Sequence, residues 1–211
     1  MTATSLPDTR TRILDAALDL FSEHGFEGTT LQQIADRLGF TKAALYYHFR
    51  SKDDLLHALH EPAAADLDRL LDAHAQLPNT AARRQQFVAD YLDFLLRHRR
   101  LIAYTFRDLA TLAHPAVASG SRERRARIEA ALAGDDVDFS GQVRIAMVFG
   151  GMHSVIARYP DCDDPALRDA LIDAAGMLLR PRRSVHARPR SQGEGERVGP
   201  HTLERRRDAP A

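Results

Sequence analysis

The chain has 211 residues, is 44% hydrophobic and carries no formal net charge at pH 7, which allows one substantial core with a small satellite domain. No apolar run approaches the roughly 20 residues that span a bilayer, and the polar start TATSLPDTR lacks the apolar stretch of a signal peptide. Cys162 has no second cysteine to pair with, which argues against a disulfide-stabilised secreted protein. Together these features argue against a membrane protein and predict a cytoplasmic location.

The first predicted helix covers residues 9–24. Ile13, Ala17 and Phe21 recur four residues apart and belong to one apolar stripe. Gly25 follows and is expected to end the helix. We expect this helix to serve as a scaffold that packs on the two helices after it.

The second predicted helix begins at Leu31. Thr30 stands where an N-cap hydroxyl is needed, and Gln33 follows three residues later, which is the capping-box arrangement. One apolar stripe, with spacing i, i+3, i+4 and i+7, then consists of Leu31, Ile34, Ala35 and Leu38. Gly39 can supply the left-handed backbone conformation that ends a helix.

A short third helix is predicted after Thr41, which can serve as its N-cap. Leu45 and Phe49 lie one turn apart on this helix, so both are expected to face the core. The two helices and the glycine between them form a helix-turn-helix pattern, in which the second helix contacts DNA bases.

The outward side of the third helix carries chemistry suited to DNA. At about 100° of rotation per residue, Lys42 and Tyr46 flank the outer face, while Ala43 and Tyr47 lie nearly opposite the buried side. A small side chain permits close approach to base edges, a lysine can reach guanine or phosphate, and a tyrosine hydroxyl can donate to phosphate. His48 follows at the helix end, where we expect the sugar-phosphate backbone.

A fourth helix is predicted after Ser51, its N-cap. Lys52 stands at the first helical position, where a cation is favourable if a phosphate lies in front of the helix. Residues 1–60 contain more acidic than basic side chains, but residues 37–52 contain basic ones only. DNA binding is therefore predicted from local placement of charge and not from a basic domain.

The segments TTLQQIADRLGF, TKAALYYHF and RSKDDLL, in this order behind an amphipathic helix, resemble the DNA-binding domain of TetR-family transcriptional regulators. The resemblance implies a homodimeric repressor that leaves its operator, a stretch of double-stranded DNA, when a small molecule occupies a separate all-helical domain. Together with the cap Thr41, the positions matched to DNA contacts are Thr30, Lys42, Ala43, Tyr46, Tyr47, His48 and Lys52.

The rest of the chain is also predicted to be helical, which makes the fold all-α. Pro62 removes one backbone donor and can kink the first of these helices. The run RERRAR is expected to form a solvated face with the i,i+4 pairs Glu123–Arg127 and Arg125–Glu129. The predicted ranges are 51–76, 80–98, 101–112, 122–132, 140–159 and 165–179.

The last two predicted helices, 140–159 and 165–179, have wide apolar surfaces with small residues. They offer more apolar face than a thin helical domain needs, which favours a two-fold dimer interface of four helices. The resemblance implies the same interface.

An effector site is expected among the middle helices, where aromatic and polar groups can converge. An apolar or aromatic small molecule is the expected ligand, although ordinary core packing explains the same periodicity. The candidates are Phe87, Tyr91, Phe94, Tyr104, Phe106, Phe149, Met152 and His153.

We therefore predict a DNA-binding domain at 1–50, a helical effector-binding and dimerisation domain at 51–180 and a disordered tail rich in Arg, Pro and Gly at 181–211. No catalytic constellation is found, and no third ligand completes a metal site with His57 and His60, so neither an enzyme nor a metal or other cofactor is expected. An effector-independent architectural DNA-binding protein remains the alternative.

Overall fold

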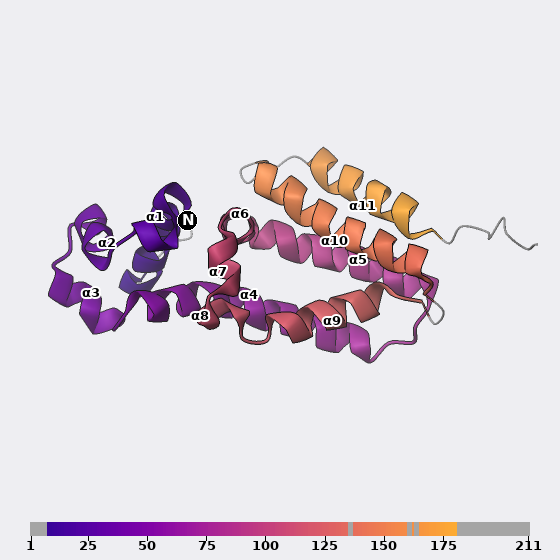
Figure 1. Cartoon of the computed structure of the whole chain (residues 1–211), viewed down its shortest axis with the longest axis horizontal. Helices are drawn as coiled ribbons and strands as arrows, with labels where there is room; N and C mark the ends of the chain where they lie inside the picture. The colour runs from indigo at the N-terminus through magenta and orange to yellow at the C-terminus, as the bar shows by residue number, and fades with distance from the viewer. Residues whose placement is uncertain (1–7, 135–136, 160–161, 163–164, 181–211) are drawn as a thin grey trace, which may run out of the picture. The chain divides into compact units, whose positions relative to one another are not determined.

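The computed structural model describes residues 8–134, 137–159, 162 and 165–180. Within these residues the regular elements are all helices, which confirms the all-α prediction (Figure 1). The tail predicted at 181–211 lies outside the described residues. The helices are α1 (Thr9–Gly28), α2 (Leu31–Leu38), α3 (Lys42–His48), α4 (Lys52–Ala75), α5 (Ala81–Arg97), α6 (Arg99–Arg107), α7 (Leu109–Ala113), α8 (Pro115–Ala118), α9 (Ser121–Leu132), α10 (Phe139–Arg158) and α11 (Pro165–Leu179).

The first three helices pack around a shared apolar centre. Ile13 of α1, Ile34 of α2 and Leu45 of α3 are fully buried, and Phe49 just after α3 is buried with them. Each of these side chains comes from a stripe predicted from sequence spacing. Their packing makes α1 the scaffold on which α2 and α3 lie, as expected.

Helix α1 leaves the helical conformation at Gly25, the residue that was predicted to end it. Gly25 has the positive φ of 74° expected of a terminating glycine, but one further helical turn follows, to Gly28. Phe26 in that turn is buried, and the Thr29 hydroxyl donates to the carbonyl oxygens of Gly25 and Leu20 at 2.9 and 3.2 Å. These contacts stabilise the extra turn. They form only when the chain turns at Gly25 and brings Thr29 close to Leu20.

The prediction of a single helix at 101–112 is wrong, because Asp108 separates α6 from α7. The carboxylate of Asp108 accepts from the backbone N–H of Thr111 at 3.3 Å and so caps α7, and it also accepts from the N–H of Phe26 at 3.2 Å. The bond to α1 fixes the position of Asp108. The apolar spacing of residues 101–112 cannot predict this bond, because its partner lies in another helix.

Helix α9 is joined to α4 by arginines. The predicted Arg125–Glu129 pair is present at 2.9 Å, but Arg124 binds Asp68 of α4 through two nitrogens at 2.9 and 2.7 Å, and Arg127 bonds Asp72 of α4. The expectation of a purely solvated face is wrong for these two arginines, because their acids come from a distant helix.

Helices α5, α6, α10 and α11 pack together in one layer. Helix α10 packs on α6 and α11, and α11 also contacts α5 (Figure 1). Helix α4 runs without interruption through Pro62. Buried side chains from α1 to α11 join in one apolar cluster, so α4 connects the first three helices to this layer through a continuous core.

Gly39 tests the turn between α2 and α3. Its φ is 68°, and an added Cβ would meet no described atom within 4 Å, so Gly39→Ala should cost about 1–2 kcal/mol of stability through backbone strain alone. Gly39→Asn should cost less, because asparagine tolerates this conformation. Urea unfolding measures both variants, and an alanine variant as stable as the wild type would contradict the assignment.

Candidate nucleic-acid interface

Local hydrogen bonds cap the N-terminus of each of the two helices of the helix-turn-helix. The Thr30 hydroxyl accepts from the N–H of Gln33 at 3.2 Å, and the Gln33 side chain accepts from the N–H of Thr30 at 2.7 Å. The Thr41 hydroxyl accepts from the N–H of Ala44 at 3.1 Å. The predicted capping box and the predicted cap of α3 are therefore both present.

Helix α3 presents a polar face, as its spacing predicted. Leu45 is fully buried, whereas Tyr46 and Tyr47 are 43% and 87% exposed. Lys42, Ala43 and His48 are also exposed. The Lys42 ammonium lies 5.7 Å from the centroid of the Tyr46 ring, so the two outer residues contact each other on one side of the helix.

Two arginines of α1 lie beside α3, and sequence analysis missed them. The guanidinium of Arg10 lies 5.3 Å from the Phe49 ring centroid, and that of Arg12 lies 5.2 Å from the Phe40 ring centroid. Phe40 and Phe49 flank the two ends of α3. No local pattern places these arginines here, because their position results from the packing of α1 on the other two helices.

The basic run 37–52 is partly neutralised in the folded chain. Arg37 forms an ion pair with Glu23 of α1 at 3.0 Å. The Lys52 ammonium donates to the Phe26 carbonyl at 2.7 Å, lies 4.2 Å from the centroid of the Phe26 ring and 3.7 Å from a Glu27 carboxylate oxygen. The positive face near α3 therefore depends on Lys42, the exposed Arg50 and the arginines of α1 more than sequence indicated.

The placement of Lys52 differs from the expected one. Its ammonium contacts the end of α1, and its side chain is 22% exposed. The carbonyl and ring of Phe26 offer a closer partner than a phosphate in front of α4. A phosphate contact by Lys52 stays a prediction. In the structure, Lys52 also links the start of α4 to Phe26 at the end of α1.

Most of the effector candidates form one aromatic cluster around Tyr91. The rings of Phe87, Phe94, Phe149 and His153 have centroids 5.8, 5.8, 6.1 and 6.1 Å from that of Tyr91. The exposed Phe106 stacks on His153 at 6.2 Å, and Met152 is buried on the same helix as His153. Burial lowers the pKa of His153 and raises the pKa of Tyr91, which favours the neutral form of both.

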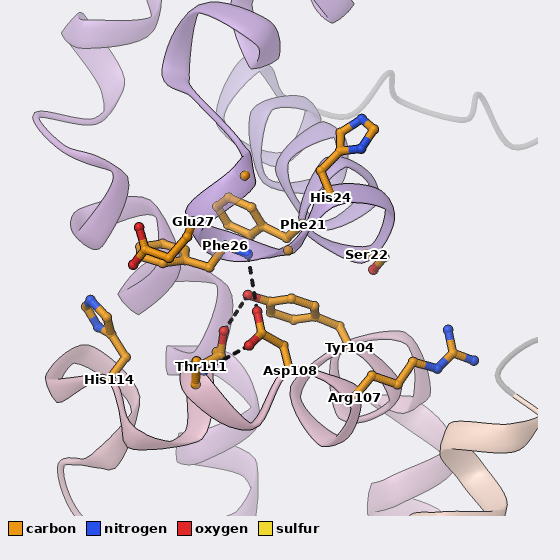
Figure 2. A pocket seen from close by; sticks show the side chains of 13 residues that line it. Phe21, Ser22, His24, Phe26, Glu27, Tyr104, Arg107, Asp108, Thr111 and His114 are labelled. Atoms are coloured by element: carbon orange, nitrogen blue, oxygen red, sulfur yellow. Dashed lines mark hydrogen bonds between the residues drawn. The ribbon is translucent and has the colours of Figure 1, made fainter.

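Tyr104 does not belong to this cluster. Its ring stacks on Phe21 of α1 at 5.9 Å, and its hydroxyl lies 2.8 Å from the Thr111 hydroxyl. Burial raises the pKa of Tyr104 to about 12, so the phenol stays protonated. Tyr104 lines a pocket of about 440 Å³ between the end of α1 and α6–α8 (Figure 2), and Phe94 lines a second pocket of about 270 Å³ between α4 and α5.

His57 and His60 gain no further ligands from the fold. His60 is bonded to the carbonyl of Leu56 at 2.9 Å and to the hydroxyl of Thr105 at 3.0 Å. Among residues 8–134, 137–159, 162 and 165–180, no cluster of three or more His, Cys, Asp or Glu side chains could hold a metal ion. In the same residues, no helix combines the length and apolarity needed to cross a membrane.

Comparison with known proteins relates this interface to bacterial regulators. Residues 13–59 match the family model described as bacterial regulatory proteins, tetR family. The HTH-type transcriptional regulator AcrR of Shigella flexneri is 40% identical over 72 residues, which are 34% of this chain and 34% of that protein. The class A tetracycline repressor from transposon 1721 of Escherichia coli is 48% identical over 54 residues, which are 26% of this chain and 25% of that protein.

The structural likeness extends over more of the chain. The crystal structure of Mycobacterium smegmatis AmtR superimposes with a TM-score of 0.66 and 26% identity, covering 86% of this chain and 91% of that one. The sequence matches thus cover about a third or less of the curated relatives, and the helical arrangement is shared beyond them.

The two lysines of the chain give a matched test of the Phe26 contact. Lys52→Ala should lower the free energy of unfolding by about 1–3 kcal/mol, because the partly buried Phe26 carbonyl loses a charged donor. Lys42→Ala, at an exposed position, should change it by less than about 0.5 kcal/mol. Urea unfolding followed by circular dichroism measures both, and equal losses would show that Lys52 does not hold Phe26.

Proposed function

Since the chain belongs to the TetR family of bacterial transcriptional regulators, we propose that it is a homodimeric repressor. It binds a near-palindromic operator through α2 and α3 and is released by a small-molecule effector. The proposal divides the chain into a DNA-binding domain at 1–50 and an effector-binding and dimerisation domain at 51–180. Its place of action is the cytoplasm, where bacterial DNA lies.

The exposed face of α3 is the observation that supports operator binding. Buried Leu45 and Phe49 hold the helix in place, and the opposite side offers Lys42, Ala43 and Tyr47 to solvent. A helix with such a face fits the major groove, where lysine can bond guanine acceptors and a small residue allows close approach.

Residues around this face are assigned to the phosphates. Thr30 and Thr41 stand at helix N-termini, where backbone N–H groups favour an anion. Tyr46, His48 and Lys52 complete the proposed contacts. Because each neutralised phosphate releases counterions, operator affinity should fall as salt rises.

The outer surface of α10 and α11 supports dimerisation. Val143, Met147 and Met177 are 41%, 55% and 66% exposed. A Cβ added at Gly150 or Gly151 would meet no described atom within 4 Å, so the backbone of α10 is open to close approach there. Two copies packed through these helices would bury the apolar face in a two-fold bundle of four helices.

Release by a small molecule is proposed from the family and from the pockets. One relative is named a tetracycline repressor, and the chain has pockets of about 440 and 270 Å³ where helices meet. A ligand can shift DNA binding only if it binds the released form more tightly than the operator-bound form. Operator binding unaffected by any ligand would favour the alternative, an architectural DNA-binding protein.

Lys42 tests base contact. Lys42→Ala should cost about 1–3 kcal/mol of binding to the operator and leave binding to scrambled duplexes nearly unchanged, if the ammonium bonds a base. Fluorescence anisotropy at fixed salt compares the two DNAs, with Arg69→Ala on α4 as the control for loss of one positive charge. Equal losses on both DNAs would assign Lys42 to phosphate instead.

Met147 tests the dimer. Met147→Glu should convert the dimer to monomers, because burying a carboxylate in the apolar contact between two copies costs several kcal/mol of desolvation. Leu77→Glu changes another exposed apolar residue, which follows α4 and belongs to neither α10 nor α11, and should leave the dimer intact. Sedimentation velocity measures both, and a wild-type chain that sediments as a monomer would refute the proposed assembly.

A further inference from the structure

The pocket of about 440 Å³ lies where the end of α1 meets α6, α7 and α8 (Figure 2). Its volume is in the range of small-molecule sites. Phe21, Phe26 and Tyr104 line its aromatic walls, although each is at most 4% exposed, and Asp108 gives it a carboxylate. None of these four residues except Tyr104 was a candidate from sequence.

Asp108 is a carboxylate held by backbone donors. Its oxygens accept from the backbone N–H groups of Phe26 and Thr111, and no cationic side chain of the described part of the chain forms an ion pair with it. Burial opposes ionisation of Asp108, but hydrogen bonds from the Phe26 backbone, from the side chain and backbone of Thr111 and from the Ala110 backbone outweigh burial and lower its pKa. A partly buried carboxylate at neutral pH thus faces the pocket with its charge uncompensated, whereas buried charges in proteins are usually paired.

The cationic groups of the pocket are directed to other partners. Arg107 donates to the carbonyl oxygen of Ala157 at 2.7 Å and extends away from Asp108 in Figure 2. His24 lies 3.6 Å from Glu23. His114 packs edge-on against Phe26, with ring centroids 4.9 Å apart, and lies 3.6 Å from Asp53. An anionic ligand would have to compete for each of them, and it would meet Asp108.

The aromatic walls define the rest of the ligand. Phe21 and Phe26 have no polar atoms in their side chains, and the Tyr104 hydroxyl is already bonded to Thr111. The body of a ligand in this pocket therefore meets apolar surface, while its polar group meets Asp108.

We propose that this pocket binds a small organic ammonium ion with an aromatic or apolar body, whose N–H groups donate to the Asp108 carboxylate, and that it is the effector site of the regulator. The role as effector site rests on the proposed function. The binding of an organic ammonium ion does not.

The position of Asp108 connects such a ligand to the DNA-binding helices. The same carboxylate bonds the N–H of Phe26, and the carbonyl of Phe26 accepts from Lys52 at the start of α4. An ammonium ion that shares the carboxylate weakens the bond to Phe26. The end of α1 and the start of α4 are then less firmly held, and these segments support α3.

Isothermal titration calorimetry on the full chain without DNA tests the site. The probes are 2-phenylethylammonium, the neutral 2-phenylethanol and the anionic 3-phenylpropionate. We expect one 2-phenylethylammonium per chain and at least tenfold weaker binding of the other two. Asp108→Asn should weaken ammonium binding at least tenfold, whereas Glu61→Gln, which removes a charge from an exposed position on α4, should leave it unchanged.

Three results would overturn the site: equal or tighter binding of 3-phenylpropionate, no binding of any probe, or full ammonium binding by Asp108→Asn. If the asparagine variant fails to fold, amide NMR of the wild-type chain decides. The ammonium must then shift the Phe26 and Thr111 amide signals most, and shifts confined to other helices would refute the site.

Operator binding is measured separately, by anisotropy with and without saturating 2-phenylethylammonium. A fall in operator affinity that is lost in Asp108→Asn supports the effector role, and unchanged affinity overturns it. A wild-type chain that binds no operator would overturn the proposed function, while the calorimetry still decides the ligand site.

Discussion

The backbone of Phe26 connects the DNA-binding helices to the rest of the chain. Its N–H donates to the Asp108 carboxylate at the start of α7, and its carbonyl accepts from the Lys52 ammonium at the start of α4. Hydrogen bonds with a charged partner contribute about 1.5–3 kcal/mol each. Gly25, with its φ of 74°, turns the chain so that both groups of Phe26 are available. Together with the apolar core, these two bonds to Phe26 hold the orientation of α1 and of the α2 and α3 that pack on it.

Much of the helix-turn-helix could be predicted from sequence, because its determinants are local. The caps Thr30, Thr41 and Ser51 each bond an N–H three residues along, and spacing alone placed Leu45 inward and Tyr47 outward. The left-handed Gly39 followed from the same short-range rules. A local rule succeeds where the partner of a group lies within one helical turn.

The remaining features depend on partners that are distant in the chain. Asp108 ends α6 through its bond to a residue 82 positions away, and Arg124 turns to Asp68, 56 positions away. Lys52 points back to α1 for the same reason. The effector candidates show a second limit: the apolar spacing that selected them reports burial, and burial placed Tyr91 in a filled cluster and Tyr104 beside a pocket. Sequence spacing does not separate these two outcomes.

If Phe26 joins α4 and α7 to α1, then the two charged side chains that bond it must depend on each other energetically. A double-mutant cycle of Lys52→Met and Asp108→Ala, measured as the free energy of urea unfolding, tests this directly. We expect a coupling free energy of about 0.5–3 kcal/mol, as found for residues in one hydrogen-bond network. Losses that add within about 0.5 kcal/mol would contradict the connection through Phe26.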